Sequence, residues 1–575
     1  MSHPFIQEAR QIVGVEHTIT DPRKMERFTK GFRFGSGSAL VVVQPATLLE
    51  MWKIAQACVK HDLILINQAS NTGLTGGSTP DGDYDRPVVI MSNRRVKGIF
   101  LINDESQAIA LPGANLFELE DELRKHNREP HSVIGSSCIG ASVVGGICNN
   151  SGGALIHRGP AYTQLAIYAK LHEDGVLRLH NELGVNLGDD PETILTRLQN
   201  RDFTSDDVIN DPSKVASDHE YQERIRDVDA DTPARFNNDG RRLYGASGSA
   251  GRLVVFAVRV DTFEKPKREK VFYIATNETK NLSKIRRHIL SHFKELPVSG
   301  EYIHRDYFTV SEKYGRDTVR VIKSVGSKYI PKFFSFKSSV DRVLNRFSFL
   351  PKGTSDLVIQ FFMNLLPSHL PKFMLDFNKK YEHHLILKMA DDGVDEAQQY
   401  FDEFFKEHEG ACHACTPEEG EMAILHRFAA AGAAKRYQVA LGKQSGGIIA
   451  FDVALRRNDE DWFEVLPPEL DKLFVSKLYC GHFFCHVMHQ DYIVKPGVDP
   501  MEAKMALFPL FDQRGAQYPA EHNVGHLYQA KEELKNFYRE NDPTNSFNPG
   551  IGKTSRLKNW CDCGEEHDGL FSGMK

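Results

Sequence analysis

The 575-residue sequence predicts an α+β fold of more than one domain, because so long a chain exceeds one ordinary domain. Short apolar runs typical of strands alternate with helical patterns over about the first 260 residues, and two long glycine- and serine-rich loops interrupt them. After about residue 262, lysine, arginine and aromatic residues become frequent. With 41% hydrophobic residues and a net charge of −6, the composition is that of a globular protein and indicates no class of partner by itself.

Strand and helix patterns follow one another along the chain. Residues 39–45 (ALVVVQP) predict a strand that ends in proline, and Thr47 and Glu50 then form a capping box at the start of a helix. Other predicted elements of the first half are strands at 63–66, 88–92, 107–114 and 253–260 and a helix at 116–126. In the second half we predict strands at 383–389, 465–470 and 481–494.

The two small-residue loops carry the first functional signal. They are NQASNTGLTGGSTP at 67–80 and GSSCIGASVVGGICNNSGG at 135–153, and the second is too rich in glycine to predict a helix or an ordinary strand. Closely spaced small residues let backbone N–H groups approach an anion without obstruction. One such loop can equally be a tight turn. Two loops, each after a strand, favour a long ligand with phosphate groups lying between them.

Several common classes are excluded by missing patterns. No G-x-G-x-x-G follows a strand, which argues against NAD, and 548–555 (NPGIGKTS) lacks the first glycine of a Walker A loop because Phe547 stands there. Nine cysteines without regular spacing do not predict a disulfide framework. Cys561, Cys563 and His567 lack a second pair of zinc ligands, so we expect a mobile tail there. We find neither a signal-peptide pattern nor an apolar membrane span, and we expect a cytoplasmic protein.

The strand, capping box, helix and NTGLTGGS loop together resemble the FAD-binding domain of the vanillyl-alcohol oxidase (p-cresol methylhydroxylase) superfamily. Longer segments between about residues 130 and 555 resemble the respiratory, quinone-dependent D-lactate dehydrogenases. The segments that carry this second resemblance are REPHSVIGSSCIGASVVGGICNNSGG, RGPAY, DADTPARFN, LPSHLP, LHRFAAAGAAKRY, YPAEHNVGHLY and YRENDPTNSFNPGIGKTS.

The resemblance implies FAD bound non-covalently between the two loops. The pyrophosphate would be held by Ala69, Ser70, Asn71, Thr72, Gly73, Gly77 and Ser78. Along the second loop, the cofactor would contact Gly135, Ser142 and Gly152. The flavin ring would meet the backbone of Val255 on its strand.

Oxidation of a 2-hydroxy acid requires a carboxylate anchor, a base for the hydroxyl proton and a hydride acceptor over Cα, which would be flavin N5. Histidine suits the base because its pKa lies near the working pH. By resemblance to related 2-hydroxy-acid dehydrogenases we predict His522 as the base and Arg427 as the anchor.

The same enzymes carry a His-x6-His motif and a Glu-His pair that bind a divalent metal, which here correspond to His482, His489 and Glu521. This sequence departs from their pattern, since FFCHVM fills an interval that is rich in glycine and aspartate in those enzymes. On a strand, His482 and His489 would face opposite sides unless a bulge intervenes, whereas His482 and His486 would share a side. Ordinary core positions therefore remain an alternative to a metal site.

A basic and aromatic segment is the remaining signal. Between Lys313 and Lys352 there are ten lysine or arginine residues against Asp317 and Asp341, with interleaved phenylalanines. No nucleic-acid-binding motif accompanies this segment, and it can also be a solvated face. We expect it to bind an anionic lipid surface and to be poorly ordered away from lipid.

The predicted organisation is an FAD-binding domain at 1–262, a substrate or cap domain at 263–514 with a basic membrane-associating segment at about 305–380, and a segment at 515–575 that returns to the FAD domain. The resemblance implies oxidation of D-lactate to pyruvate, with electrons passed to a membrane quinone at the cytoplasmic face. A flavin oxidase, a dehydrogenase of a longer acid such as 2-hydroxyglutarate, and a membrane-bound scaffold without activity remain alternatives.

Overall fold

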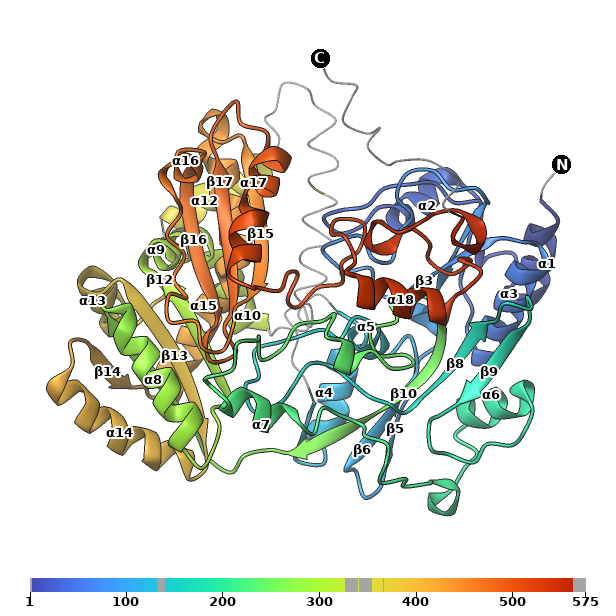
Figure 1. Cartoon of the computed structure of the whole chain (residues 1–575), viewed down its shortest axis with the longest axis horizontal. Helices are drawn as coiled ribbons and strands as arrows, with labels where there is room; N and C mark the ends of the chain where they lie inside the picture. The colour runs from blue at the N-terminus through green and yellow to red at the C-terminus, as the bar shows by residue number, and fades with distance from the viewer. Residues whose placement is uncertain (1–2, 132–139, 326–339, 341–353, 366, 562–575) are drawn as a thin grey trace.

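The computed structural model describes residues 3–131, 140–325, 340, 354–365 and 367–561. Its strands form three sheets, of four, six and seven strands. Figure 1 shows the seven-stranded sheet with its helices on one side of the molecule and the two smaller sheets on the other. The predicted α+β class is therefore confirmed. The boundaries that we place at residues 262 and 514 stay a prediction.

The four-stranded sheet starts the first half of the molecule. Its order is β1-β2-β4-β3, with parallel pairing of β4 to both β2 and β3. Thr47 caps the following helix by accepting a hydrogen bond from the Glu50 backbone, and the Glu50 carboxylate accepts one from the Ala46 N–H. The elements are α1 (Pro4–Val13), β1 (Thr18–Ile19), α2 (Pro22–Thr29), β2 (Val41–Val43), α3 (Leu48–Lys60), β3 (Ile64–Gln68) and β4 (Val88–Ser92).

The six-stranded sheet is antiparallel and has β10 at its centre. An apolar cluster formed by residues of both small sheets and of α1 and α3 lies between them, so the two sheets share one core. The elements are β5 (Ile99–Ile102), β6 (Gln107–Ala110), α4 (Leu116–Arg124), β7 (Arg128–Pro130), α5 (Val143–Cys148), β8 (Ala166–Leu171), β9 (Leu177–Asn181), α6 (Pro191–Gln199), α7 (Tyr221–Arg226) and β10 (Val254–Glu264).

The second loop contains a helix, which corrects our expectation that it holds none. The Ser142 hydroxyl accepts a hydrogen bond from the Gly145 N–H, 3.0 Å away, and so caps the short helix α5. Val143, Val144 and Ile147 are buried in an apolar cluster, and this packing offsets the cost of two glycines in one helix. Gly135 lies outside the described residues.

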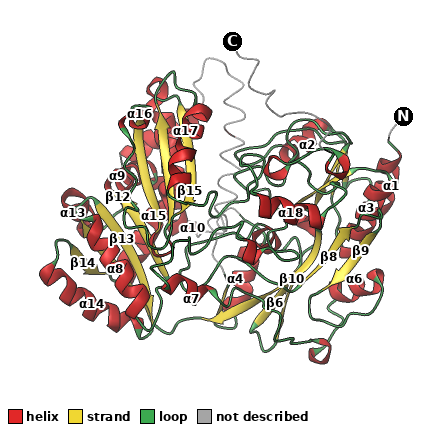
Figure 2. Ribbon diagram, in the orientation of Figure 1, coloured by secondary structure: helices red, strands yellow, loops and turns green. Residues whose placement is uncertain are grey.

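The seven-stranded sheet, order β14-β11-β13-β12-β16-β17-β15, is antiparallel throughout. Helices cover both faces: α8, α14 and α17 pack on one, and α9, α13 and α15 on the other (Figure 2). The elements are β11 (Glu269–Thr276), α8 (Thr279–His292), β12 (Ser299–His304), α9 (Arg305–Tyr314), α10 (Arg316–Val325), α12 (Thr354–Asn364), α13 (Lys372–Lys380), β13 (His383–Ala390), α14 (Gly393–Glu407), β14 (Ala411–Ala414), α15 (Pro417–Leu441), β15 (Gly447–Ala454), α16 (Pro468–Asp471), β16 (Phe474–His482), β17 (Val487–Val494) and α17 (Pro500–Gln513).

The predicted basic segment is described only in part. Residues 326–339 and 341–353 lie outside the described residues, so the expectation that this segment is poorly ordered away from lipid stays a prediction. Two of its arginines bond this region: Arg316 donates to Met363 O of α12 at 3.5 Å, and Arg320 donates to Pro367 O, just after α12, at 3.0 Å. Within the described ranges we find no helix whose length and apolar character would let it cross a bilayer.

The C-terminal segment crosses back to the first half of the molecule, where α18 (Glu532–Asn541) and the residues after it lie beside the small sheets (Figure 1). Leu65 of β3 forms a parallel bridge with Phe547. Arg252, which is fully buried, donates to Asn545 Oδ1 at 2.6 Å and lies 4.0 Å from the Asp542 carboxylate. A buried cation next to the first residues of β10 therefore fixes the returning chain.

We expect the substitution Arg252→Met to lower the free energy of unfolding by about 3–5 kcal/mol, because it leaves the buried Asp542 carboxylate without its counter-charge. Urea unfolding monitored by circular dichroism measures the effect. The matched control is Arg94→Met, at an exposed arginine, which should change stability by less than about 0.5 kcal/mol. A loss below about 1 kcal/mol for Arg252→Met would show that the ion pair does not hold the segment.

Candidate active site

A hairpin brings His482 and His489 together, which corrects the continuous strand predicted at 481–494. The chain reverses between β16 and β17 through a single helical turn at 483–485, followed by His486 in the left-handed region at φ 53°. Cys480 pairs with His489 across the hairpin, so His489 lies on the face that His482 shares with Cys480. The two imidazole rings meet edge to face, 5.0 Å apart.

Glu521 completes a cluster of three potential metal ligands. Its Oε2 lies 3.2 Å from His482 Nε2 and 3.5 Å from His489 Nε2. Within the described residues these ligand atoms all fall within 4.8 Å of one another. Two further buried groups surround them: Glu301 Oε1 lies 2.6 Å from His482 Nδ1, and Arg235 donates to Glu521 Oε1 at 2.8 Å.

The charges in this cluster are coupled. Burial by itself would lower the pKa of His482, but the carboxylates of Glu301 and Glu521 outweigh burial and raise it to about 10. Burial would raise the pKa of Glu521, yet His482 and then Arg235 hold it well below its usual range. Burial lowers the pKa of His489 to about 4, so this imidazole is neutral. The cluster therefore offers one anionic oxygen and two imidazoles at a single point.

These residues fit a divalent metal. Two imidazoles and one carboxylate are a ligand set of catalytic zinc sites. Because Glu301 binds His482 Nδ1, the other ring nitrogen faces Glu521, which is how a carboxylate beyond the ligands orients a metal-binding histidine. Metal binding would displace the proton from His482.

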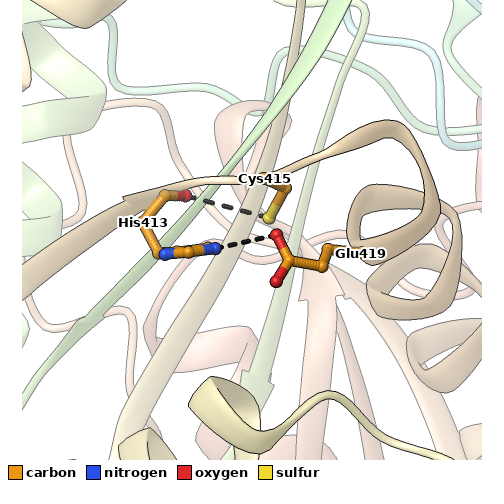
Figure 3. Close-up of side chains that lie close together, drawn as sticks. All are labelled: His413, Cys415 and Glu419. Carbon is orange, nitrogen blue, oxygen red and sulfur yellow. Dashed lines mark hydrogen bonds and ion pairs between the residues drawn. The ribbon is translucent and has the colours of Figure 1, made fainter.

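Figure 3 shows a second group, His413, Cys415 and Glu419, whose ligand atoms also lie within 4.8 Å of one another. Glu419 is already engaged, because it forms the capping box of α15 with Thr416 and bonds His413 Nε2 at 2.9 Å. The N-terminus of a helix carries positive partial charge, which disfavours a cation. We therefore assign no metal to this group.

His522 is held by an acid from another strand. Its Nδ1 lies 2.8 Å from Oδ2 of Asp452 on β15, and the same oxygen accepts a hydrogen bond from the Glu521 N–H at 2.6 Å. Burial would lower the pKa of His522, but the charge of Asp452 and their hydrogen bond outweigh burial and raise it. With Nδ1 engaged, Nε2 is the ring nitrogen left to accept a proton from a ligand.

Arg427 lies at the same site. It projects from α15, and its Nη2 is 3.1 Å from Glu301 Oε2, in a side-chain pair that is about one-tenth exposed. Glu301 thus connects Arg427 with His482. Burial raises the pKa of Asp491, and Asp452 raises that of His522; the charge of Arg33, a residue that we did not predict, opposes both shifts in part.

The two glycine loops fit a long ligand. Among the described residues, a Cβ atom added at Gly73 or Gly140 would meet nothing within 4 Å, so the backbone is open at both positions. Within the described residues, the buried oxygens Asn67 Oδ1, Asn150 Oδ1 and Ser249 Oγ near these loops have no hydrogen-bond partner. A dinucleotide with many polar groups would supply such partners.

The other predicted cofactor residues lie around the same loops. Ala69, Ser70, Asn71 and Thr72 follow β3 and are partly buried, and Ser78 donates to Asn71 Oδ1 at 3.2 Å. Val255 is buried in β10 next to a bulge in its pairing with β8. A direct contact of these residues with the cofactor stays a prediction.

Asn523 joins the loops to the acid and base groups. Its carbonyl accepts a hydrogen bond from Thr75 Oγ1 in the first loop, at 2.8 Å, and its side chain donates to Asn149 Oδ1 in the second loop, at 2.6 Å. The preceding two residues of the chain are Glu521 and His522. His522, the candidate base, therefore directly precedes the residue that bonds both loops.

Two protein families match the sequence: one described as FAD binding domain, over residues 39–176, and one described as D-lactate dehydrogenase, membrane binding, over residues 271–560. The quinone-dependent D-lactate dehydrogenase of Haemophilus influenzae is 57% identical over 560 residues, which cover 97% of this chain and 99% of the relative. That of Escherichia coli is 55% identical and covers 97% of both chains. The chain belongs to the quinone-dependent D-lactate dehydrogenases.

The family match confirms the expected FAD cofactor. Among solved structures, p-cresol methylhydroxylase with bound substrate shares the fold at a TM-score of 0.56 and 13% identity, and the alignment covers 96% of both chains. The predicted fold, that of the vanillyl-alcohol oxidase type, is thereby confirmed.

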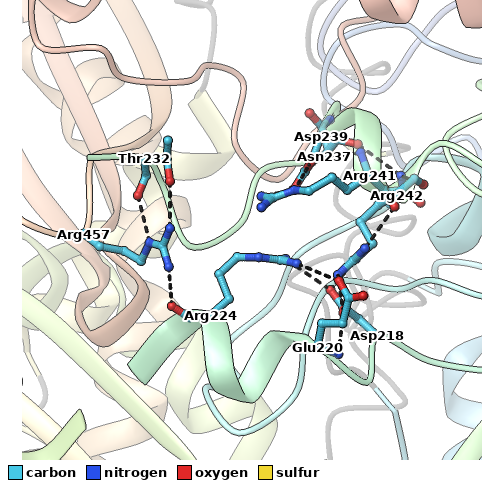
Figure 4. Close-up of polar contacts among 10 residues, drawn as sticks. Asp218, Glu220, Arg224, Thr232, Asn237, Asp239, Arg241, Arg242 and Arg457 are labelled. Carbon is cyan, nitrogen blue, oxygen red and sulfur yellow. Dashed lines mark hydrogen bonds and ion pairs between the residues drawn. The ribbon is translucent and has the colours of Figure 1, made fainter. Parts of the chain in front are cut away.

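Sequence reasoning missed Arg235, although it lies in the DADTPARFN segment that contributed to the family resemblance. Charged contacts hold the surrounding segment, as Figure 4 shows. Arg242 donates twice to the Asp218 carboxylate at 2.6 Å, and Arg457 donates to Thr232 Oγ1 at 2.7 Å. Arg235 itself donates to Gly153 O and to Glu521 Oε1. A buried arginine beside the Glu-His pair could have been suspected only from the family resemblance.

Gly152 packs against this site and gives a test of it in this dehydrogenase family. A Cβ atom at Gly152 would lie 2.7 Å from Glu521 Oε1, so the carboxylate would have to move. We expect Gly152→Ala to slow flavin reduction by D-lactate up to about 100-fold, because small displacements of reacting groups are costly. Stopped-flow absorbance measures this rate.

The matched control is Gly432→Ala in α15, where an added Cβ meets no described atom within 4 Å. It should leave the rate within about twofold of wild type and stabilise the helix slightly. Equal rates for Gly152→Ala and wild type would show that Glu521 has no place in the reaction.

Proposed function

We propose that this chain uses FAD to oxidise D-lactate to pyruvate and passes the electrons to a membrane quinone. The observation that carries the proposal is the segment 521–523. It places a potential metal ligand, an imidazole paired with an aspartate and a contact with both cofactor loops at three successive residues.

Each side chain then has a separate task. Arg427 binds the substrate carboxylate, since a planar guanidinium suits two parallel hydrogen bonds. His522 accepts the proton of the 2-hydroxyl group at Nε2, and Asp452 fixes the ring orientation and stabilises the imidazolium that results. Bound FAD supplies the hydride acceptor for the substrate Cα–H.

His482, His489 and Glu521 would hold a divalent cation beside His522. Such an ion supplies Lewis acidity toward the oxygens of the substrate. Glu301 keeps His482 in the orientation that a ligand needs and also contacts Arg427. The anchor and the metal ligands are thus fixed relative to each other by one buried carboxylate.

The surface around α12 supports binding to lipid. Val358, Phe361, Phe362 and Leu365 are exposed at spacings of three and four residues, so they form one apolar stripe. We propose that this stripe enters the interface of an anionic membrane at its cytoplasmic face, where the predicted basic segment adds attraction of about 1 kcal/mol for each cation at the surface. The acceptor is then the quinone of that membrane rather than NAD.

An anaerobic absorbance spectrum tests the proposal. We expect D-lactate, and not L-lactate, to bleach the flavin band near about 450 nm. Faster bleaching by D-2-hydroxyglutarate would move the substrate to a longer acid, and formation of hydrogen peroxide in air would indicate an oxidase. A purified protein with no flavin band after addition of FAD would overturn the proposal.

A further inference from the structure

Two histidines, His426 on α15 and His369 shortly before α13, have no polar partner among the described residues. His426 is fully buried, His369 is partly buried, and all four of their ring nitrogens are without a hydrogen bond in the part of the chain that the structure describes. The two ring centres are 6.1 Å apart, and the ring of Phe308 lies 4.3 Å from that of His426. The pair therefore combines four unused polar atoms with an aromatic surface.

Such a pair calls for an explanation. A buried N–H group without an acceptor costs stability, so native proteins rarely keep one unless it serves a ligand or a water molecule. Burial lowers the pKa of His369 to about 4 and that of His426 well below its usual range, so both rings are neutral. A neutral imidazole offers one donor and one acceptor. The pair can thus bind a carbonyl oxygen or a hydroxyl group equally well.

In the sequence, the pair is close both to the proposed substrate anchor and to the proposed membrane-binding stripe. His426 precedes Arg427 on α15, so one turn of this helix carries both a member of the pair and the proposed substrate anchor. In the sequence, His369 follows Leu365, the last residue of the exposed apolar stripe, by four residues. Arg320 fixes this connection through its hydrogen bond to Pro367 O.

We propose that His369 and His426 bind the head group of the membrane quinone, whose apolar tail leaves along the stripe of α12. This inference rests on the proposed function and assigns a binding site to its electron acceptor. A quinone has carbonyl oxygens that accept from an imidazole N–H, and the quinol has hydroxyl groups that donate to an imidazole nitrogen. Phe308 provides a ring against which the head group packs.

The overall reaction balances without another reactant. Oxidation of D-lactate to pyruvate breaks the Cα–H and O–H bonds and releases two electrons and two protons. Reduction of a quinone to a quinol consumes two electrons and two protons and forms two O–H bonds. Bound FAD would supply the carrier for the two electrons. Because both imidazoles are neutral, each ring can exchange a proton with the head group.

The test is His369→Leu in the full-length holoenzyme, with a short-chain, water-soluble benzoquinone as the probe. The variant should fold with a Tm equal to or above that of wild type, because leucine removes unpaired polar atoms from a buried place. Bleaching of the flavin by D-lactate and turnover with a soluble dye as acceptor should stay within twofold. The KM for the benzoquinone should rise at least tenfold.

A binding measurement without turnover accompanies it. In the absence of D-lactate, the benzoquinone should raise the Tm of the wild-type protein and leave that of His369→Leu unchanged, since a ligand stabilises only a state that it binds. The matched control is His288→Leu, at a partly buried histidine of α8 on the opposite face of the sheet, which should behave as wild type. His426→Leu should repeat the result of His369→Leu and covers the case in which that variant does not fold.

Three outcomes would overturn the inference: an unchanged KM for the benzoquinone in both variants, an equal loss of dye and benzoquinone turnover, or a benzoquinone-induced Tm shift that survives both substitutions. In the first case the histidines hold only an ordered water. Failure of D-lactate to bleach wild-type flavin would instead contradict the proposed function, so the two failures are distinguishable.

Discussion

The substitution His522→Gln should lower the rate of anaerobic flavin reduction by D-lactate by about 100-fold to 10,000-fold, the range that a positioned general base contributes. Glutamine can keep a hydrogen bond to Asp452, which accepts from His522 Nδ1 at 2.8 Å in wild type, but it cannot accept the hydroxyl proton. The flavin band and the Tm should stay close to those of wild type. Stopped-flow absorbance in the flavin band gives the rate.

The control for this variant is His219→Gln. That histidine is mostly exposed and pairs with Asp261, away from the hairpin. Its rate should equal that of wild type. Near-normal flavin reduction by His522→Gln would remove His522 as the base and direct the search to other groups near Asp452.

Much of the fold follows from local sequence patterns. The runs at 63–66 and 88–92 form the buried β3 and β4, and the helix predicted at 116–126 forms α4 with a capping box of Asn115 and Glu118. These elements need only apolar periodicity and a cap, which neighbouring residues supply. The hairpin of β16 and β17 could not be predicted in this way. FFCHVM contains no glycine or proline, and the reversal depends on His486 in a left-handed conformation.

The candidate site was predictable only in part for a related reason. His482, His489, Glu521 and His522 lie within about forty residues and carry a recognisable spacing. Their partners are distant in the sequence: Glu301 lies on β12, Asp452 on β15 and Arg235 in a loop before β10. Sheet order, which pairs β12 with β16 and β15 with β17, brings Glu301 and Asp452 to the site. Local patterns contain no information on that order.

Because these groups meet at one point, we expect removal of a bound metal to have a large effect on the rate of flavin reduction. Without a cation, Glu521 is held among His482, His489 and Arg235, and the ring of His482 keeps its proton. The carboxylate would then no longer be available to organise the substrate oxygens beside His522. Lewis acidity is worth several kcal/mol of stabilisation at developing charge.

Prolonged dialysis of the purified protein against a strong chelator should therefore lower D-lactate-dependent flavin reduction at least about 1,000-fold, which corresponds to about 4 kcal/mol. The flavin band should persist, because the FAD loops do not include the three ligands. Addition of Zn²⁺ or Mn²⁺ should restore the rate in wild type and not in His489→Leu, which lacks one imidazole of the cluster. Elemental analysis before and after dialysis gives the metal content. Full activity in a metal-free protein would show that His482, His489 and Glu521 form an ion-pair network that orients His522, and that the substrate is held by Arg427 alone.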